Sequence, residues 1–512
     1  MINASEAFYN VITSNVRPEM HISIEVYKGG FSTNTMQYYI EVVKTFTEHD
    51  ITSLTFKNGI DPLSRELPEL SLEWKQVITD KTKDTTKYAG CGVMLKFRQD
   101  LGYTNSWSNI KQSKKTWGGL KKQTWYDVRT SSIAEDLTMP VMCMLAEPTI
   151  QNDEITWKAG GILQYIQSVK IALGTKINGV FGETTSSGLV NRIIEDGSYN
   201  TNVSGFLYKS FEEIRDYFSA LEGDFAKILP NKPIVIDDTV ADSLNGVLSM
   251  YCMYIKNARP SNDYDYYCKL NLGIIFSSFE EAKHDNTIIT IDENCMYSYP
   301  EITETSNIYN YEYKTYLNTV DYDSPSMVDS NTSYATDDET RIMGFGYNLG
   351  SPFDKYGDFK TTPALQAANA IGSVREFSAH FKNPNDVSVK LTVYPINSTS
   401  VSNVLNVTDG GENYTEDNKF CVFGPNDTEI STKKENLKKY LNSNSCSLQF
   451  EFNGNPMLEP GDIVKIPTGK TYKSGDNVLP IIKKCVIIST ELTYNGSLKG
   501  KIIAHGLSEE QQ

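Results

Sequence analysis

The side chains that could act as nucleophiles or general bases are scattered through this chain. None of its five histidines stands in an H-E-x-x-H, G-x-S-x-G or Cys/His signature, the patterns that bring a base, a metal or a nucleophile together. The histidines are His21, His49, His284, His380 and His505. Two carboxylates could still meet in the folded chain, as they do in glycosidases. The pattern favours a protein that is not an enzyme, with a hydrolase as the least favoured alternative.

Metal-ligating patterns are also missing from the sequence. The eight cysteines include no C-x-x-C pair and have no histidine nearby in a zinc-like spacing. They are Cys91, Cys143, Cys252, Cys268, Cys295, Cys421, Cys446 and Cys485. We expect buried free thiols in a reducing compartment and no bound metal.

Two further signals are too incomplete to indicate a ligand. The acidic residues Asp321, Asp323, Asp329, Asp337 and Asp338 suggest calcium, but a loop counted from Asp321 lacks the glycine and the final glutamate of an EF-hand. The glycine-rich run 344–350 is one residue off a dinucleotide fingerprint and is not flanked by a clear βαβ unit. A solvated loop and a turn are favoured, and no cofactor is expected.

Composition limits the partners. The chain has 512 residues, with 48 Lys and Arg against 64 Asp and Glu, for a formal net charge of −16. A chain this acidic is a poor candidate for nucleic-acid binding, which needs clustered cations. The start lacks the basic and apolar regions of a secretion signal, and no apolar run approaches the roughly 18 residues of a membrane span. We expect a protein without membrane contact that is assembled in the cytoplasm.

The elements that would position these residues are mostly strands in the first portion. Ile22, Ile24 and Val26 alternate with Ser23, Glu25 and Tyr27, which predicts a half-buried strand after an opening helix at 4–15. Further strands are expected at 51–56, 71–77, 92–98, 125–129 and 154–158. All five tryptophans fall in this portion, so large aromatic side chains should build its core or an interface.

Helical spacing replaces the strand pattern from about residue 159. Ser210 and Glu213 form a capping box, and a second helix is predicted at 240–256 with Leu244, Leu248 and Tyr251 facing inward. Strands return at 269–276 and 287–292. We expect an α/β insertion.

The stretch after the insertion alternates tyrosines with polar residues. Tyr309, Tyr311 and Tyr313 predict an aromatic-faced strand at 306–317 that could close the first barrel. A long exposed loop is expected at 321–338, a helix at 363–371 and a strand at 387–394.

The end of the chain contains two sequence signals for tight turns. Pro460 and Gly461 supply the fixed φ and then the positive φ of a type II turn, and Asn495-Gly496 is a strong hairpin signal. Between them, Val486, Ile488, Leu492 and Tyr494 should share a core face, opposite Ser489, Glu491 and Thr493 on a wet face. A short helix capped at 432–435, with Leu437 and Tyr440 on one side, should precede a strand that contains Cys446, Leu448, Phe450 and Phe452.

Together these segments predict a mainly β chain with an α+β insertion. We expect two β-barrel domains and an α/β insertion domain, at the usual domain size of roughly 100 to 200 residues. The expected first barrel covers 1–158 and is completed by about 296–320, the insertion covers 159–295, a loop-rich α+β domain covers 321–405, and the C-terminal barrel covers 406–512.

The terminal pattern N-P-x-L-E-P-G-D-x-V followed by L-T-Y-N-G-x-L-K resembles the last domain of the baseplate hub, or tail-associated protein, of phages and tailocins from Gram-positive hosts. The residues that carry this likeness are Pro456, Pro460, Gly461, Asp462, Asn495 and Gly496. Segments 51–72 and 155–166 are similar to the start of the same family and to the junction after its first domain.

The resemblance implies a structural, non-enzymatic role. In that family three subunits, each with two barrels, form a ring that joins a tail tube to a central spike. It implies a homotrimer whose partners are the tube protein, the spike protein and other baseplate proteins, in a phage tail, tailocin or other contractile injection system. The protein would be found in the virion or tailocin particle after assembly in the bacterial cytoplasm. Many relatives continue into a fibre or a lysin, so a separate polypeptide is expected to supply that part here.

A second, local resemblance suggests an alternative. Residues Asn178, Gly179, Phe181, Gly182 and Thr185, within 163–195, are similar to the D-G-x-F-G-x-x-T run of a small peptidoglycan-binding module. The spacing of the preceding Leu-Gln and Leu-Gly pairs is longer than in that family, and Asn178 replaces its Asp. A tight turn between helices of the insertion is the favoured interpretation of this segment. The alternative functions are a tail-tip protein that binds the cell wall or, less favoured, a wall hydrolase.

Overall fold

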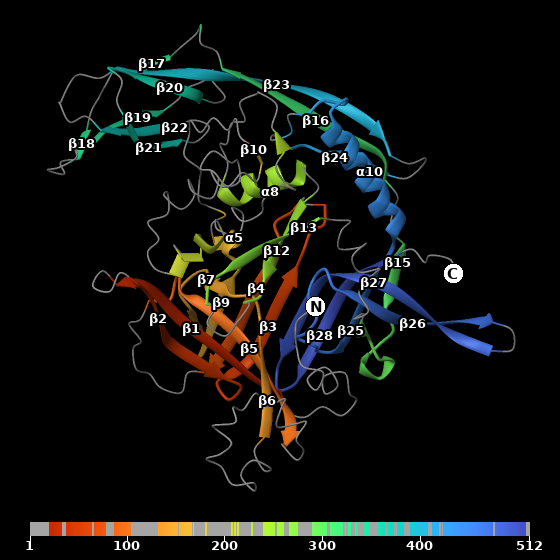
Figure 1. Ribbon diagram of the computed structural model, residues 1–512. Coiled ribbons are helices and arrows are strands. Elements are labelled where there is room, and N and C mark those ends of the chain that lie inside the picture. The colour runs from red at the N-terminus through yellow and green to blue at the C-terminus, as the bar shows by residue number, and fades with distance from the viewer. Residues whose placement is uncertain are drawn as a thin grey trace, which may run out of the picture.

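The chain forms a large sheet built from both of its ends, with smaller sheets and helices above it in the view of Figure 1. The architecture is that of a computed structural model. The structure describes residues 20–32, 37–63, 66–77, 87–103, 132–151, 153–165, 167, 180–181, 206–207, 209–210, 212–214, 227–228, 239–250, 253–260, 266–274, 289–304, 308–320, 323, 326–328, 333–335, 342–348, 356–363, 366–372, 376–382, 390–407, 412–418, 421, 423–474 and 477–507.

In the described part of the chain, the large sheet has 15 strands, and all of its strand pairs are antiparallel except β14 with β26. Its main path runs β15-β25-β28-β27-β3-β4-β9-β7-β5-β1-β2, with β6, β8, β14 and β26 beside it. The strands are β1 (Met20–Ser32), β2 (Gln37–Thr47), β3 (Ile51–Gly59), β4 (Leu70–Val77), β5 (Gly92–Tyr103), β6 (Ser132–Thr138), β7 (Met142–Met144), β8 (Thr149–Gln151), β9 (Glu154–Gly160), β14 (Ile289–Thr290), β15 (Glu301–Glu304), β25 (Asn444–Asn453), β26 (Ile463–Ser474), β27 (Asn477–Tyr494) and β28 (Leu498–Leu507).

The prediction of a mainly β chain is confirmed, but the described strands form no closed barrel. Their path ends at β15 on one side and at β2 on the other. The N-terminal and C-terminal strands belong to one sheet because β27 pairs with β28 on one edge and with β3 on the other. Strands from the two ends of the chain are therefore hydrogen-bonded neighbours.

Smaller sheets and helices fill the middle of the chain. β16 pairs with β23 and β24, and β15 pairs with β25 of the C-terminal portion. The sheet strands are β10 (Val180–Phe181), β11 (Lys227–Ile228), β12 (Met253–Ala258), β13 (Lys269–Ile274), β16 (Ile308–Val320), β17 (Ser326–Val328), β18 (Ser333–Ala335), β19 (Ile342–Asn348), β20 (Tyr356–Thr362), β21 (Gln366–Gly372), β22 (Glu376–Lys382), β23 (Lys390–Asn406) and β24 (Glu412–Glu416). The helices with described bounds are α5 (Ile162–Tyr165), α8 (Val240–Met250), α10 (Thr428–Ser443) and the 3-10 turn η2 (Glu293–Cys295).

Several sequence-based elements are right and others are wrong. Strands β3, β4, β5, β9 and β13 occupy their predicted segments. The predicted helix at 363–371 is wrong, because those residues include β21, which pairs with β22. The segment 321–338, predicted as a loop, contains β17 and β18. The predicted helix at 240–256 ends at Met250, after which β12 begins. The predicted opening helix and the strand at 125–129 lie outside the described residues.

The core between β1–β5 and β9 is built on aromatic stacking. Trp74 and Trp157 face each other across β4 and β9, with ring centroids 5.7 Å apart and planes 8° apart. Phe46 meets both rings edge-on, at 5.5 Å from Trp74 and 5.0 Å from Trp157. Ile22, Ile24 and Val26 of β1 join this core, as their alternation predicts.

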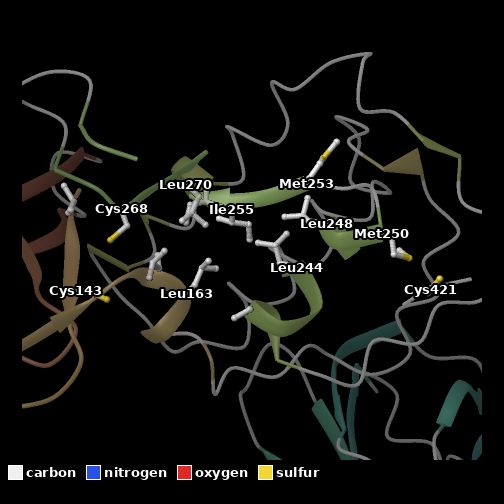
Figure 2. Close-up of a cluster of buried hydrophobic side chains, with 14 of the residues drawn as sticks. Cys143, Leu163, Leu244, Leu248, Met250, Met253, Ile255, Cys268, Leu270 and Cys421 are labelled. Atoms are coloured by element: carbon white, nitrogen blue, oxygen red, sulfur yellow. The ribbon is translucent and has the colours of Figure 1, made fainter. Parts of the chain in front are cut away.

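A second core joins the large sheet to the middle of the chain. Figure 2 shows Leu244 and Leu248 of α8 beside Ile255 of β12 and Leu270 of β13. Tyr27 of β1 also lies in this core, although its sequence position predicted the wet face. Both faces of β1 are covered here, because Phe206 and Tyr266 pack against Tyr27 on the face that an isolated strand would leave in water. The Tyr27 hydroxyl donates to the backbone oxygen of Tyr266, and burial raises the pKa of Tyr27 well above its usual value.

The described cysteines are buried free thiols, as expected. The seven that the structure describes are Cys91, Cys143, Cys268, Cys295, Cys421, Cys446 and Cys485. Among the described helices, none is long and apolar enough to cross a membrane.

Replacing Trp157 by alanine should remove the centre of the aromatic core. Trp157 is 1% exposed, so we expect a loss of about 3–5 kcal/mol of unfolding free energy, the usual cost of an aromatic-to-alanine cavity. Chemical denaturation followed by circular dichroism measures it. The matched control is Ile150→Ala, whose side chain is 69% exposed and whose loss should stay within roughly 0.5 kcal/mol. Equal effects at the two positions would contradict this picture of the core.

Candidate functional site

The described residues place the chain's most distinctive geometry where its two ends meet. β27 runs antiparallel to β3, with register pairs from Ser489 opposite Gly59 to Tyr494 opposite Leu54. The seam continues past β3, because the Ile60 amide donates to the Ile488 backbone oxygen at 3.0 Å. We call this pairing the β3–β27 seam.

β27 contributes side chains to three cores along its length. Cys485 and Ile487 lie in the core between β25 and β28, and Val486 packs with Ile60 and Tyr440 on the opposite face. A register shift then falls between Ile487 and Ser489, and Leu492 enters the tryptophan core. The prediction of one buried face and one wet face is therefore wrong at 485–487, because neighbouring elements cover both sides of the strand there.

The turn before β26 has the geometry that its residues predict. The Asp462 amide donates to the Glu459 backbone oxygen at 3.1 Å, and Gly461 has φ +93°, as a type II turn with Pro460 at its second position requires. The turn is tied to β27 by two bonds, from the Gly461 amide to the Ile487 oxygen and from the Ile487 amide to the Asp462 oxygen. Burial raises the pKa of Asp462.

Arg259, which sequence reasoning missed, clamps this turn to the rest of the molecule. It follows β12, and its guanidinium pairs with the Glu459 carboxylate. It also donates to the Pro456 backbone oxygen at 2.7 Å and to the Thr138 backbone oxygen at 3.4 Å. One buried side chain thereby ties the insertion, the end of β6 and the terminal turn together. No local signal reveals this contact, since Arg259 and Glu459 are 200 positions apart.

The hairpin at Asn495-Gly496 is present between β27 and β28. Tyr494 pairs with Leu498, so the loop has three residues, and Gly496 has φ +100°. Pro456, by contrast, contributes through its backbone oxygen. All six residues of the terminal turn motif therefore lie in described structure. Pro456 is in the turn 455–458, Pro460, Gly461 and Asp462 are in the turn before β26, and Asn495 and Gly496 are in the hairpin after β27.

Of the residues named for the peptidoglycan-like motif, the structure describes one, Phe181. Phe181 lies in β10, which pairs with β11. Asn178, Gly179, Gly182 and Thr185 lie outside the described part of the chain. The role of this motif stays a prediction.

Ser210, predicted as a helix cap, has another role. It is buried, and its hydroxyl accepts a hydrogen bond from the Cys268 amide at 3.2 Å.

A buried ion pair joins α8, β24 and α10. Lys433 of α10 bonds to the Glu416 carboxylate and donates to the Ser249 backbone oxygen at 2.9 Å. The Tyr311 hydroxyl donates to the same carboxylate at 2.7 Å. Burial alone would raise the pKa of Glu416, but the charge of Lys433 and these hydrogen bonds, with one from Asn418, hold it below its usual value. The pair is satisfied on both sides, as a buried charge requires.

The base of α10 meets β28 through a histidine. The Tyr440 hydroxyl lies 2.9 Å from His505 Nδ1. Burial lowers the pKa of His505 to about 4, so the ring is neutral near pH 7.

These arrangements join parts of the chain that are far apart in the sequence. In the described residues, no cluster of three or more His, Cys, Asp or Glu side chains could hold a metal ion. The β3–β27 seam and the contacts of Arg259 connect the two ends of the chain.

No protein-family model matches the sequence, and no curated protein matches it either. Among solved structures, it is similar to the 43 kDa tail protein of prophage MuSo2 from Shewanella oneidensis, with 8% identity, a TM-score of 0.39, and 94% of this chain and 98% of that one covered. It is similar to a tail protein from Neisseria meningitidis, with 7% identity, a TM-score of 0.39, and 95% and 97% covered. It is also similar to prophage tail protein gp18 from Listeria monocytogenes, with 9% identity, a TM-score of 0.35, and 96% and 95% covered. Scores this low do not establish a shared fold.

Replacing Arg259 by methionine should loosen the clamp between the three parts. The change leaves Glu459 and two backbone oxygens without their donor, so we expect a loss of roughly 2–5 kcal/mol of unfolding free energy. Denaturant unfolding measures it, with the exposed Arg98→Met as the matched control. A loss no larger than that of the control would show that the clamp does not hold the junction.

The stability of the C-terminal portion should fall as pH drops from about 6.5 to about 4. Because the folded pKa of His505 is lowered to about 4 from 6.5, the unfolded chain binds a proton in this window that the folded chain does not. The stability from the neutral ring is thus present above pH 6.5 and is lost on acidification. Unfolding midpoints against pH measure this, and His505→Gln, which cannot titrate, should show a shallower dependence. Parallel curves would contradict the assignment.

Proposed function

We propose that this chain is a structural subunit of a phage tail or tail-like particle. In the finer form of the proposal it acts as a baseplate hub or tube adaptor that joins the tail tube to a central spike. It works as a homotrimer and carries out no reaction. Its partners are the tube protein, the spike protein and other baseplate proteins, and its location is the tail or baseplate of the particle.

The β3–β27 seam is the observation that carries the proposal. An adaptor needs modules that keep a constant relative position, so that copies can meet in a fixed geometry. Backbone hydrogen bonds from Ser489 to Tyr494 join the first and last modules into one sheet. Arg259 then fixes the insertion to the same junction.

The terminal turn motif supports the finer form. Its residues resemble those of the hub family, and they lie in two successive turns before β26 and in the hairpin after β27. The open sheet also suits assembly, since β15 and β2 each leave an outer edge unpaired within the described residues. Sheet edges are ready sites for contact with another chain.

Antibody labelling of particles tests the proposal. Tails from a lysate of the source cell should carry the label at one end of the tube, in electron micrographs of negatively stained particles. Particles without label, or label only on wall fragments, would contradict the proposal and favour the wall-binding alternative.

Zymography on purified cell walls is a second test, and a cleared band from the purified chain would overturn the non-enzymatic role.

A further inference from the structure

β26 and β27 continue beyond the sheet as a two-stranded arm, which we define as residues 467–474 and 477–484. β28 pairs with β27 only from Cys485 onward, and β14 pairs with β26 only at Val464 and Lys465. Within the described residues, the two strands of the arm therefore pair only with each other. Figure 1 shows the arm projecting away from the body of the molecule. An isolated two-stranded ribbon is marginally stable in water, so a covering surface would stabilise it.

One face of the arm is apolar in the middle and basic at both ends. Val478 and Ile482 are 60% and 42% exposed. Residues opposite each other in the register share a face, which assigns seven exposed or half-exposed residues to this outer face. They are Thr471, Lys473, Val478, Pro480, Ile482 and Lys484 of the arm, together with Lys465 just before it. Pro467, opposite Ile482 on the same face, is buried.

The same face is covered nearer the sheet. Val486 lies two residues beyond Lys484 and opposite Ile463, and both side chains are buried against Ile60 and Tyr440. The outer face is thus the uncovered continuation of a surface that the molecule otherwise buries. At its apolar centre, Val478 and Ile482 stay exposed in this chain.

The charge of the arm is opposite to that of the chain. Residues 467–474 and 477–484 contain four lysines and no acidic residue, whereas the whole chain has a formal net charge of −16. Among the described side chains, no carboxylate forms an ion pair with Lys465, Lys473 or Lys484. A second copy of this chain therefore offers the complementary charge.

The best-matched surface on that copy is a strip at residues 292–304, which we call the acidic strip. Tyr297 and Tyr299 are each 53% exposed in it. Its exposed carboxylates belong to Asp292, Glu293, Glu301 and Glu304. The sequence has no lysine or arginine between Lys283 and Lys314. The strip includes β15, at the free end of the sheet path.

One tyrosine of the acidic strip already contacts a lysine of its own chain. Lys499 Nζ lies 5.9 Å from the centroid of the Tyr297 ring, a cation–π contact. Tyr299, in contrast, lies against Gly469 at the base of its own arm, where a Cβ atom would come within 2.6 Å of the ring. Tyr299 remains 53% exposed beside this contact, so most of its ring is open to a further partner.

We propose that the outer face of the arm docks on the acidic strip of a second copy of this chain. Val478 and Ile482 pack against the two tyrosines, and the lysines at both ends of the face meet the carboxylates. The two surfaces are different, so the contact is head-to-tail and closes into a ring when the rotation between copies allows it. This inference rests on the proposed function, in which copies of the subunit form a ring.

Disulfide capture between two differently tagged chains tests the contact. One full-length chain carries Val478→Cys and the other carries Glu301→Cys, and the seven described native cysteines are buried. After mixing and mild oxidation, a mixed dimer should appear on a non-reducing gel. The matched control pairs Val478→Cys with Glu154→Cys, a side chain 44% exposed on β9. A mixed dimer no stronger than in the control overturns the inference.

Charge reversal gives a second readout. The triple change Lys465→Glu, Lys473→Glu and Lys484→Glu should lower capture by roughly tenfold, from three partly exposed pairs. Adding Glu293→Lys and Glu304→Lys to the chain that carries Glu301→Cys should restore it. Unchanged capture, or no restoration while both chains melt like the wild type, contradicts the assigned strip. If the reversal instead abolishes binding to an anionic wall polymer and leaves self-association intact, the occupant is that polymer and the inference is wrong.

Labelled particles separate this inference from the proposed function. If the antibody labels the tube end of the tails but the chain shows no disulfide capture, the proposed structural role holds and only the arm contact is wrong. Capture by a chain that is absent from tails supports the arm contact and removes the proposed role.

Discussion

The backbone pairing between β3 and β27 is the constraint on which the rest of the structure depends. It brings residues near position 55 next to residues near position 490, and it makes one sheet from segments that the sequence separates by most of its length. Each hydrogen bond of the seam has a modest net effect on stability, but a ladder fixes register and direction together. Once this register is set, the tryptophan core and the C-terminal core lie on one continuous frame.

Buried charges then determine how the middle of the chain sits on that frame. Arg259 and Glu459 form one junction, and Lys433 with Glu416 forms another beside α8. Buried ion pairs contribute little net stability, because desolvation offsets much of their attraction. Their effect here is geometric, since a displaced Arg259 or Lys433 would leave a buried carboxylate or a backbone oxygen without its donor. Alternative placements of the insertion are therefore disfavoured more strongly than the native one is stabilised.

Surfaces that the frame leaves open are distributed unequally. The tyrosine and leucine faces of the middle sheets and helices are buried in a shared core, whereas the arm formed by β26 and β27 extends the sheet without a third strand. Rigid interiors combined with exposed strand surfaces are typical of proteins whose work is assembly, because binding surfaces must be held in place before a partner arrives. In the described residues, the buried ion pairs and the seam lie where segments far apart in the sequence meet.

Local patterns in the sequence determined much of this protein. The alternation at Ile22, Ile24 and Val26, the strand at β4, and the positive φ at Gly461 and Gly496 all follow from neighbouring residues, because strand faces and turns depend on contacts within a few positions. Tertiary structure decided the burial of Tyr27 and of both faces at 485–487, the strand at β21 and the partner of Arg259. Those outcomes depend on elements tens to hundreds of residues away, which cover a face or supply a counter-charge that no local spacing encodes.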